Sequence, residues 1–253
     1  MRVILAEKPS VAQSIAAVLG ANQKRNGYLQ GENDLVSWCI GHLIELAPPE
    51  IYDARYAKWR REDLPIVPSA WESVVSDGTK KQFAVLKDLL NRTDVDEVVC
   101  ATDAGREGEL IFRMVYEKTG CTKPVKRLWI SSLEESAIRE GFRSLKPGTA
   151  YDALYRAALC RAQADWLVGI NGTRLYSRLY GTKLNVGRVM TPTLAMVVQR
   201  EKEIAAFQVE RFYTVQLSCG FPVQSGRIKT REEAERIRAS CHCKKAAVKQ
   251  IER

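Results

Sequence analysis

The sequence predicts an α/β fold: a parallel sheet with helices on both faces, then a mainly helical lobe and a short α+β tail. Short apolar strands alternate with amphipathic helices up to about residue 145, and a long helical pattern follows over residues 150–180. Lys146-Pro147-Gly148 separates these two patterns. Hydrophobic residues make up 45 % and charged residues 27 % of the chain, which is typical of a globular protein.

The alternation of strands and helices begins at the amino terminus. An apolar strand over residues 2–7 precedes a helix that starts at Lys8-Pro9-Ser10, where a first-turn proline is tolerated, and Gly20 ends it. Residues 27–46 alternate in polarity around turn residues, which predicts a β-hairpin with a return strand. The proline-containing residues 48–70 predict a long ordered loop that leaves the alternating pattern, and this segment is called the excursion.

The rest of the chain continues both patterns. Before the break, helices are predicted at about residues 79–91, 106–118 and 134–143, and strands at 97–101 and 125–130. After it, helices are predicted at about 150–180, 192–206 and 230–240, and strands at 212–218 and 245–251. We therefore expect three domains: residues 1–148 with an insertion at about 27–75, residues 149–207, and the start of a further domain at 208–253.

Composition narrows the class of protein. Lys and Arg number 39 against 30 Asp and Glu, and the resulting net charge of +9 favours a polyanionic partner. The seven cysteines are an odd number scattered through apolar segments, which is typical of thiols in a reducing cytosol. No apolar run approaches the ~20 residues of a membrane span, and no secretory signature opens the chain. We therefore expect a cytoplasmic protein that works near nucleic acid.

Acidic side chains follow two of the predicted strands. Glu7 ends the first strand, Asp103 follows the strand at 97–101, and Glu107 and Glu109 open the next helix. Carboxyl ends of parallel strands face one crevice, and carboxylates that converge there repel one another unless a cation such as Mg²⁺ lies between them. Alternatively, Glu7 and Glu107 only stabilise helix amino termini. Spacing alone leaves both interpretations open.

Four segments stand in a fixed order and spacing. They are residues 6–10 (AEKPS), 101–109 (ATDAGREGE), 161–171 (RAQADWLVGIN) and 187–194 (GRVMTPTL). Together they resemble the type IA DNA topoisomerases, close to topoisomerase III, over residues 1 to about 207. Each segment alone is weak, but four in register are specific. The resemblance implies a Toprim domain, with a Rossmann-like parallel sheet, followed by a helical DNA-binding lobe.

The resemblance also implies roles for the acidic residues. Glu7, Asp103 and Glu107 match the family's Mg²⁺ ligands, and Lys8 matches the lysine that contacts the scissile phosphate, so Glu7 and Lys8 are the candidate catalytic residues. The family's D-x-D-x-E run departs here at its middle acid, where Gly105 stands. The number of Mg²⁺ ions is therefore open.

The long helix has two predicted sides. At ~100° per residue, Arg156, Arg174 and Arg178 lie opposite an apolar stripe. The stripe consists of Leu154, Ala157, Ala158, Val168, Leu175 and Leu179. Arg161 and Asp165 fall inside this stripe one turn apart and can pair. Arg161 either forms a structural ion pair or lines a DNA groove, and both interpretations stay open.

A segment after the long helix matches the family's binding segment for single-stranded DNA. It consists of Asn185, Val186, Gly187, Arg188, Val189 and Met190, just before a helix opened by Thr191-Pro192. Gly187 permits close backbone approach, Arg188 can bind phosphate, and helix amino-terminal amides favour an anion. These six residues, with Arg161, Arg174 and Arg178, are the candidate DNA-binding residues.

The resemblance implies Mg²⁺-dependent breakage, passage and rejoining of single DNA strands through a 5′-phosphotyrosine, in the cytoplasm at the nucleoid. The implied transesterification conserves bond energy and so needs no ATP, which agrees with the absence of a G-x-x-x-x-G-K-[ST] loop from the sequence. None of the nine tyrosines lies in a Tyr-Pro-Arg-Thr-Asp-like run, so we expect an amino-terminal fragment that binds Mg²⁺ and single-stranded DNA without cleaving it. Alternatives are another Toprim enzyme, such as a primase or nuclease, or a non-catalytic DNA-binding protein. The sequence identifies no helicase or recombination partner.

Overall fold

The computed structural model describes residues 1–218, 222–242 and 244. The chain divides into two compact units, Met1–Pro192 and Thr193–Arg253, which are described separately. The first unit holds a sheet with helices on both faces, which confirms the predicted α/β class. The predicted domain boundaries near residues 148 and 207 stay predictions.

Seven strands of the described residues form the main sheet, in the order β2-β3-β4-β1-β7-β8-β9. These strands are β1 (Arg2–Ala6), β2 (Gln23–Arg25), β3 (Tyr28–Gln30), β4 (Asp34–Trp38), β7 (Glu97–Ala101), β8 (Val125–Arg127) and β9 (Lys146–Pro147). The central strands β4, β1, β7 and β8 are parallel, which was predicted for β1, β7 and β8. Both edges are antiparallel, because β3 forms a hairpin with β4 and β9 returns along β8.

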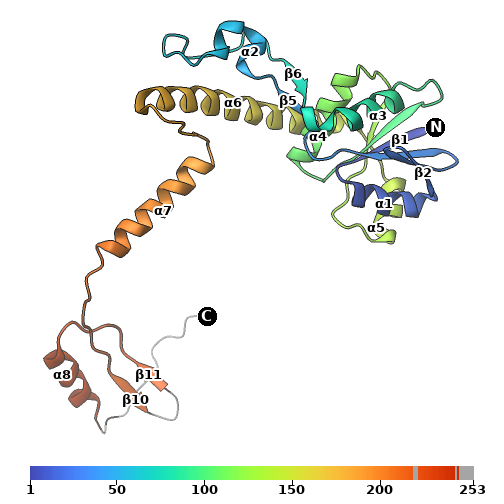
Figure 1. Cartoon of the computed structure of the whole chain (residues 1–253). Helices are drawn as coiled ribbons and strands as arrows, with labels where there is room; N and C mark the ends of the chain where they lie inside the picture. Colours follow the sequence, from blue (N-terminus) through green and yellow to red (C-terminus); the bar gives the residue numbers. More distant parts are fainter. Residues whose placement is uncertain (219–221, 243, 245–253) are drawn as a thin grey trace. The chain divides into compact units, whose positions relative to one another are not determined.

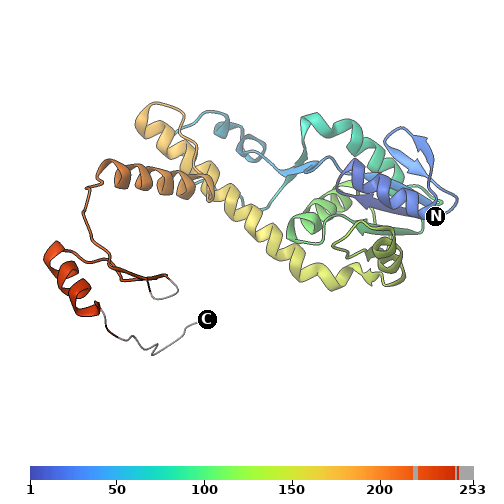
Figure 2. The ribbon, with the colours of Figure 1, turned by 90° about the horizontal axis from the view of Figure 1, so that it is seen from below.

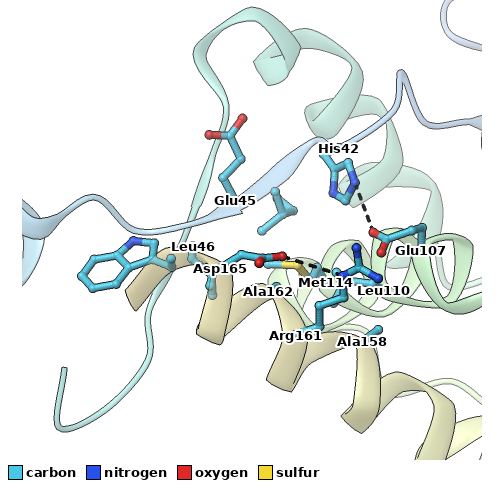
Figure 3. Close-up of a pocket in the computed structure, with 12 residues that line it drawn as sticks. His42, Glu45, Leu46, Glu107, Leu110, Met114, Ala158, Arg161, Ala162 and Asp165 are labelled. Atoms are coloured by element: carbon cyan, nitrogen blue, oxygen red, sulfur yellow. Dashed lines mark ion pairs between the residues drawn. The ribbon is translucent and has the colours of Figure 1, made fainter. Parts of the chain in front are cut away.

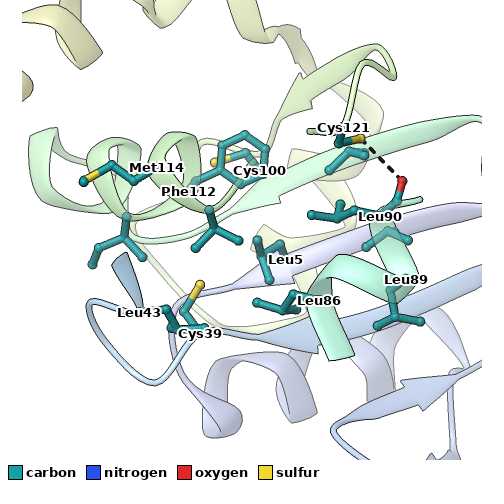
Figure 4. Close-up of a cluster of buried hydrophobic side chains, with 14 of the residues drawn as sticks. Leu5, Cys39, Leu43, Leu86, Leu89, Leu90, Cys100, Phe112, Met114 and Cys121 are labelled. Carbon is teal, nitrogen blue, oxygen red and sulfur yellow. Dashed lines mark hydrogen bonds between the residues drawn. The ribbon is translucent and has the colours of Figure 1, made fainter. Parts of the chain in front are cut away.

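Helices cover both faces of this sheet (Figure 1). On one face lie α3 (Lys80–Leu90) and α4 (Arg106–Thr119), and on the other α1 (Pro9–Leu19) and α5 (Glu135–Arg143). Successive side chains of a strand point to opposite faces, so Leu5 packs with Leu86 and Phe112 on one side (Figure 4). Its neighbour Ile4 packs with Ile138 on the other side. Burial on both faces explains why β1 is apolar throughout.

The predicted return strand pairs outside the main sheet. β5 (Ile44–Leu46) pairs antiparallel with β6 (Ser73–Val75), so the expectation that it completes the hairpin at 27–46 is wrong. Its partner lies almost thirty residues further on, beyond the reach of a local alternation pattern. The excursion between the two strands contains α2 (Pro49–Tyr52) and the 3₁₀ helix η1 (Ala54–Ala57). A second 3₁₀ helix, η2 (Asp77–Thr79), leads into α3.

The long helix α6 (Asp152–Tyr180) follows the 3₁₀ helix η3 (Gly148–Tyr151) and changes its packing partner along its length. Its first turns pack Ala158 into the core beside α4. Its later turns lie along the excursion (Figure 2). There the Asn171 side chain accepts from the Ile66 N–H at 2.6 Å and donates to the Ile66 carbonyl at 2.9 Å.

This change of partner overturns the predicted apolar stripe of α6. Val168 and Leu179, both assigned to the stripe, are 44 % and 51 % exposed. A single stripe requires one partner along the whole helix, whereas α6 has two, on different sides.

The second unit is smaller. The helix α7 (Met190–Ala205) crosses from the first unit into it, followed by the hairpin β10 (Gln216–Ser218) and β11 (Pro222–Gln224) and the helix α8 (Arg231–Cys241). Val215, Ile228 and Ala234 form its core. The strand predicted at 245–251 lies outside the described residues. Across the described ranges, no helix is both long and apolar enough to cross a membrane.

Candidate metal and nucleic-acid site

The carboxyl edge of the sheet brings Glu7 and Asp103 together. The parallel register pairs Ala6 of β1 with Ala101 of β7, so the two strands end side by side. Glu7 Oε2 accepts a hydrogen bond from the Asp103 backbone N–H at 3.3 Å, and Lys8 Nζ lies 3.7 Å from Glu7 Oε1. Glu7 is nearly buried, whereas Lys8 and Asp103 are exposed. The shielded Glu7 carboxylate thus lies beside the backbone of the exposed Asp103 and the ammonium group of the exposed Lys8.

The turn that carries Asp103 is held against the first turn of α4. Thr102 Oγ1 donates to the Gly108 carbonyl at 2.7 Å. A Cβ atom at Gly108 would lie only 2.2 Å from the Asp103 carbonyl oxygen, so this close approach requires glycine. Gly105 is different, because its backbone is extended (φ −174°) and a Cβ atom there would meet nothing within 4 Å.

Glu107, the third predicted ligand, points into a neighbouring pocket (Figure 3). Its Oε2 lies 3.9 Å from Nε2 of His42, a residue that the sequence analysis missed. His42 lies just beyond the carboxyl end of β4, a strand parallel to β1. This place after a strand is the sequence signal that could have identified His42 as a site residue. Within residues 1–218, 222–242 and 244, no three His, Cys, Asp or Glu side chains gather closely enough to hold a metal ion. The three predicted ligands are therefore not assembled into one cluster.

The long helix forms the other wall of this pocket. Arg161 Nε lies 3.8 Å from Asp165 Oδ2, and Arg188 Nη1 donates to Asp165 Oδ1 at 2.9 Å. All three side chains are almost half exposed, so the apolar stripe to which Arg161 and Asp165 were assigned does not bury them. The predicted pair exists, and Arg161 also lines the pocket with Glu107 (Figure 3). Both interpretations of Arg161 agree with this geometry.

The segment from Asn185 to Met190 lies against α6. Val186 N–H donates to Thr173 Oγ1 at 2.9 Å, and a Cβ atom at Gly172 would lie 2.8 Å from Val186 Cγ1. Gly187 N–H donates to Thr191 Oγ1 at 3.1 Å, while Thr191 N–H donates back to the Gly187 carbonyl. Asn185, Arg188, Val189 and Met190 are exposed. Their side chains are therefore accessible to a ligand.

Arg174 differs from the exposed side predicted for it. It is 4 % exposed, its Nη1 donates to the Tyr56 carbonyl at 2.7 Å, and its guanidinium lies over the Trp59 ring. Burial lowers the pKa of Arg174, while nearby Glu50 acts in the opposite direction. The excursion covers this side of α6, so the predicted solvent-facing position is wrong for Arg174. Arg178 is exposed as predicted.

Comparison with known proteins places the chain in a family. The family model described as "Toprim domain" matches residues 2–133, and the model described as "DNA topoisomerase" matches residues 149–253. The chain belongs to the Toprim family. The resemblance of this Toprim chain to type IA DNA topoisomerases, inferred from four short segments, is thereby confirmed.

Relatives of this Toprim chain carry a consistent name. It is 50 % identical over 236 residues to DNA topoisomerase 3 of Shouchella clausii, covering 93 % of this chain and 32 % of that protein. It is 47 % identical over 239 residues to DNA topoisomerase 3 of Staphylococcus epidermidis, covering 93 % of this chain and 34 % of that protein. The chain thus spans about a third of the length of these curated relatives.

A solved structure shares the fold. Full-length topoisomerase I from Thermotoga maritima superposes with a TM-score of 0.62 over 93 % of this chain and 37 % of that one, at 24 % sequence identity. At this identity the likeness concerns the fold alone.

Proposed function

We propose that this chain supplies the Mg²⁺-binding and single-stranded-DNA-binding part of a type IA DNA topoisomerase of the topoisomerase III kind. Such an enzyme breaks, passes and rejoins single DNA strands through a 5′-phosphotyrosine intermediate. The observation that carries the proposal is the juxtaposition of Glu7, Lys8 and Asp103 at the carboxyl edge of the parallel strands. The 50 % identity to proteins named DNA topoisomerase 3 supports it.

The carboxylates at this edge suit Mg²⁺. This ion is usually held by one or two carboxylates together with substrate phosphates, and it keeps several of its waters. Glu7 places one such carboxylate against the Asp103 backbone, and Asp103 is the proposed second ligand. Glu107 is the proposed third ligand after its side chain turns away from His42. When bound, Mg²⁺ would supply charge stabilisation at the phosphate and orientation of the 3′-hydroxyl for rejoining.

The proposed DNA path runs from this edge along α6. Lys8 places a compact positive charge where the scissile phosphate would lie. Arg188 donates to Asp165 in the free protein and, in the proposed complex, donates to a backbone phosphate in place of Asp165. The exposed residues of the Asn185–Met190 segment, with Arg161 and Arg178, are the proposed further contacts. Arg174, held by the Tyr56 carbonyl, anchors the excursion instead.

The proposed reaction is transesterification. A tyrosine oxygen attacks a backbone phosphorus, the bond to the 3′-oxygen breaks, and that oxygen leaves as a hydroxyl group. Attack by the same hydroxyl reverses both changes, so no nucleotide hydrolysis is needed. No tyrosine of this sequence lies in a Tyr-Pro-Arg-Thr-Asp-like run, and the nucleophile is not assigned to a residue of this chain. Action on DNA implies a place at the nucleoid, in the cytoplasm.

The first test mixes the chain with labelled single-stranded DNA and Mg²⁺ and measures both binding and covalent trapping. We expect a bound complex that denaturant dissociates completely. A denaturant-resistant adduct would mean that a tyrosine of this chain is catalytic. Nucleotide incorporation would indicate a primase and strand nicking a nuclease, whereas DNA binding without any metal binding would indicate a non-catalytic DNA-binding protein.

Removal of the Asp103 carboxylate tests the metal site. Asp103→Asn keeps the side-chain shape but removes the charge, and we expect it to lower the affinity for Mn²⁺, used as a spectroscopic probe for Mg²⁺, by at least about tenfold. Electron paramagnetic resonance titration measures the affinity. Asp88→Asn, which changes an exposed carboxylate on α3, is the matched control. Equal affinities in both variants would remove Asp103 from the site.

Removal of the Arg188 guanidinium tests the DNA path. A protein that neutralises phosphates releases counterions, so each lost phosphate contact lowers the salt dependence of affinity. We expect Arg188→Ala to weaken binding of single-stranded DNA and to reduce the log–log salt slope by roughly 0.7. Arg139→Ala, which removes an exposed, ion-paired arginine of α5, should leave the slope unchanged. An unchanged slope in Arg188→Ala would exclude this phosphate contact.

A further inference from the structure

Arg127, the last residue of β8, buries its entire side chain beneath the Asp103 turn. Its Nη1 donates to the carbonyl oxygens of Thr102 at 2.7 Å, Leu128 at 2.8 Å and Cys100 at 3.2 Å. Its Nη2 donates to the Asp103 carbonyl at 2.7 Å. Burial of a guanidinium is costly unless its donors meet acceptors. Four backbone carbonyls accept from Nη1 and Nη2, whereas the buried Nε makes no hydrogen bond within the described part of the chain.

The counter-charge comes from the helix that follows the turn. Arg127 Nε lies 3.0 Å from Glu109 Oε2, and Glu109 is 1 % exposed. Glu109 Oε1 accepts from Arg113 Nε at 2.9 Å, and Arg113 also reaches the Gly148 carbonyl and Asp152. The glutamate is thus shared by two arginines, of which only Arg127 contacts the turn.

The turn needs such a donor because it lies beyond the sheet. The register between β7 and β8 ends at the pair Cys100 and Arg127, so the Thr102 and Asp103 carbonyls have no strand partner. The Asp103 carbonyl also accepts from the Gly105 N–H at 2.8 Å, so the Thr102 carbonyl depends most on Arg127. Buried backbone carbonyls without a hydrogen bond are costly. The guanidinium of Arg127 takes the place of the missing strand.

We infer that Arg127 is a positioning residue of the proposed metal site: it fixes the Thr102–Asp103 backbone so that the Asp103 amide meets Glu7 and the Asp103 side chain emerges beside it. The Arg127 side chain is fully buried, so it acts through the turn. The inference rests on the proposed function, because it assigns a purpose to the geometry of Asp103. Partners that orient a metal ligand typically change metal affinity 10–100-fold when removed.

A purely structural role for Arg127 is the competing explanation, and Arg113 separates the two. Arg113→Met removes the other arginine from Glu109 and several hydrogen bonds, but none to the turn. Arg127→Met removes all four carbonyl contacts. Arg127→Lys keeps the charge, yet a single ammonium has only three donors and cannot span the same carbonyls.

The experiment compares the unaltered chain with Arg127→Lys, Arg127→Met and Arg113→Met. Thermal unfolding gives stability, Mn²⁺ titration by electron paramagnetic resonance gives metal affinity, and hydrogen exchange reports the amides of residues 103–105. We expect both Arg127 variants to exchange faster at these amides and to bind Mn²⁺ about tenfold more weakly, with Lys the milder change. Arg113→Met should lose stability while keeping the exchange rates and the affinity.

Equal exchange rates and affinities in Arg127→Lys and Arg113→Met would overturn the inference. If Arg127→Met fails to fold, Arg127→Lys carries the comparison. If the unaltered chain binds no Mn²⁺, the proposed metal role fails. The exchange rates then decide separately whether Arg127 positions the turn, so the two failures are distinguishable.

Discussion

Two glycines three residues apart in the Asp103 turn obey different constraints. At Gly108 a methyl group would overlap the Asp103 carbonyl, whereas at Gly105 it would point into open space. We expect Gly108→Ala to lower the free energy of unfolding by about 1–3 kcal/mol through overpacking and to weaken Mn²⁺ binding as the turn shifts. Gly105→Ala is the control and should keep Mn²⁺ affinity, as measured by metal titration, while urea unfolding gives the stability of both variants. Equal losses in both variants would show that the turn tolerates no side chain at either position.

Restoring the acid that the family pattern has at position 105 is the converse experiment. Gly105 is the N-cap of α4, where aspartate is favoured, and its extended backbone suits any residue. We expect Gly105→Asp to fold and to bind Mn²⁺ several-fold more tightly, because it adds a carboxylate beside Asp103. Gly105→Asn, which caps equally well without the charge, is the control. No gain over Gly105→Asn would mean that the added carboxylate points away from the site.

Among the elements, α6 depends on a close contact with the segment that follows it. Gly172 lies against Val186, whereas a Cβ atom at Gly169 would make only ordinary contact, 3.6 Å from the Val186 carbonyl oxygen. Alanine is favoured over glycine inside a helix by ~1 kcal/mol. We therefore expect Gly169→Ala to stabilise the chain and to keep DNA affinity, and Gly172→Ala to displace the 185–188 segment and weaken DNA binding. Fluorescence anisotropy with labelled single-stranded DNA measures this difference, and equal affinities would contradict it.

The elements also show what the sequence could and could not predict. β1, α1, β7 and α4 were predicted nearly to the residue, because apolar runs and caps are local signals, and Glu7 and Asp103 followed from their places after strands. The buried position of Arg174 and the exposure of Val168 could not be predicted. The burial of Arg174 depends on an excursion more than 100 residues earlier in the chain, which helical periodicity does not encode. Arg127 and His42 escaped notice because neither lies in a recognised motif.

At the scale of the whole molecule, burial predicts which of the described cysteines react with a thiol reagent. Cys39, Cys100 and Cys121 are buried in the core, and burial raises the pKa of Cys100 to about 11, so thiolate is scarce there. Cys160 is exposed on α6. We expect iodoacetamide at mildly alkaline pH to modify Cys160 quickly and the three core cysteines only after unfolding, as peptide mass spectrometry would show. Labelling of Cys100 at the rate of Cys160 in the native protein would contradict this burial.

The central position of β1 has a consequence for how the chain acquires its native state. The first strand to be synthesised pairs with residues 34–38 on one side and 97–101 on the other, so it must wait for much later segments. Such non-local pairing slows folding. On the ribosome, the edge that carries Glu7 gains its second neighbour only after β7 emerges, and the Asp103 turn gains its inner support only after Arg127 does. Nascent chains that end before Arg127 should contain secondary structure, but the edge that carries Glu7 and Asp103 should not be ordered.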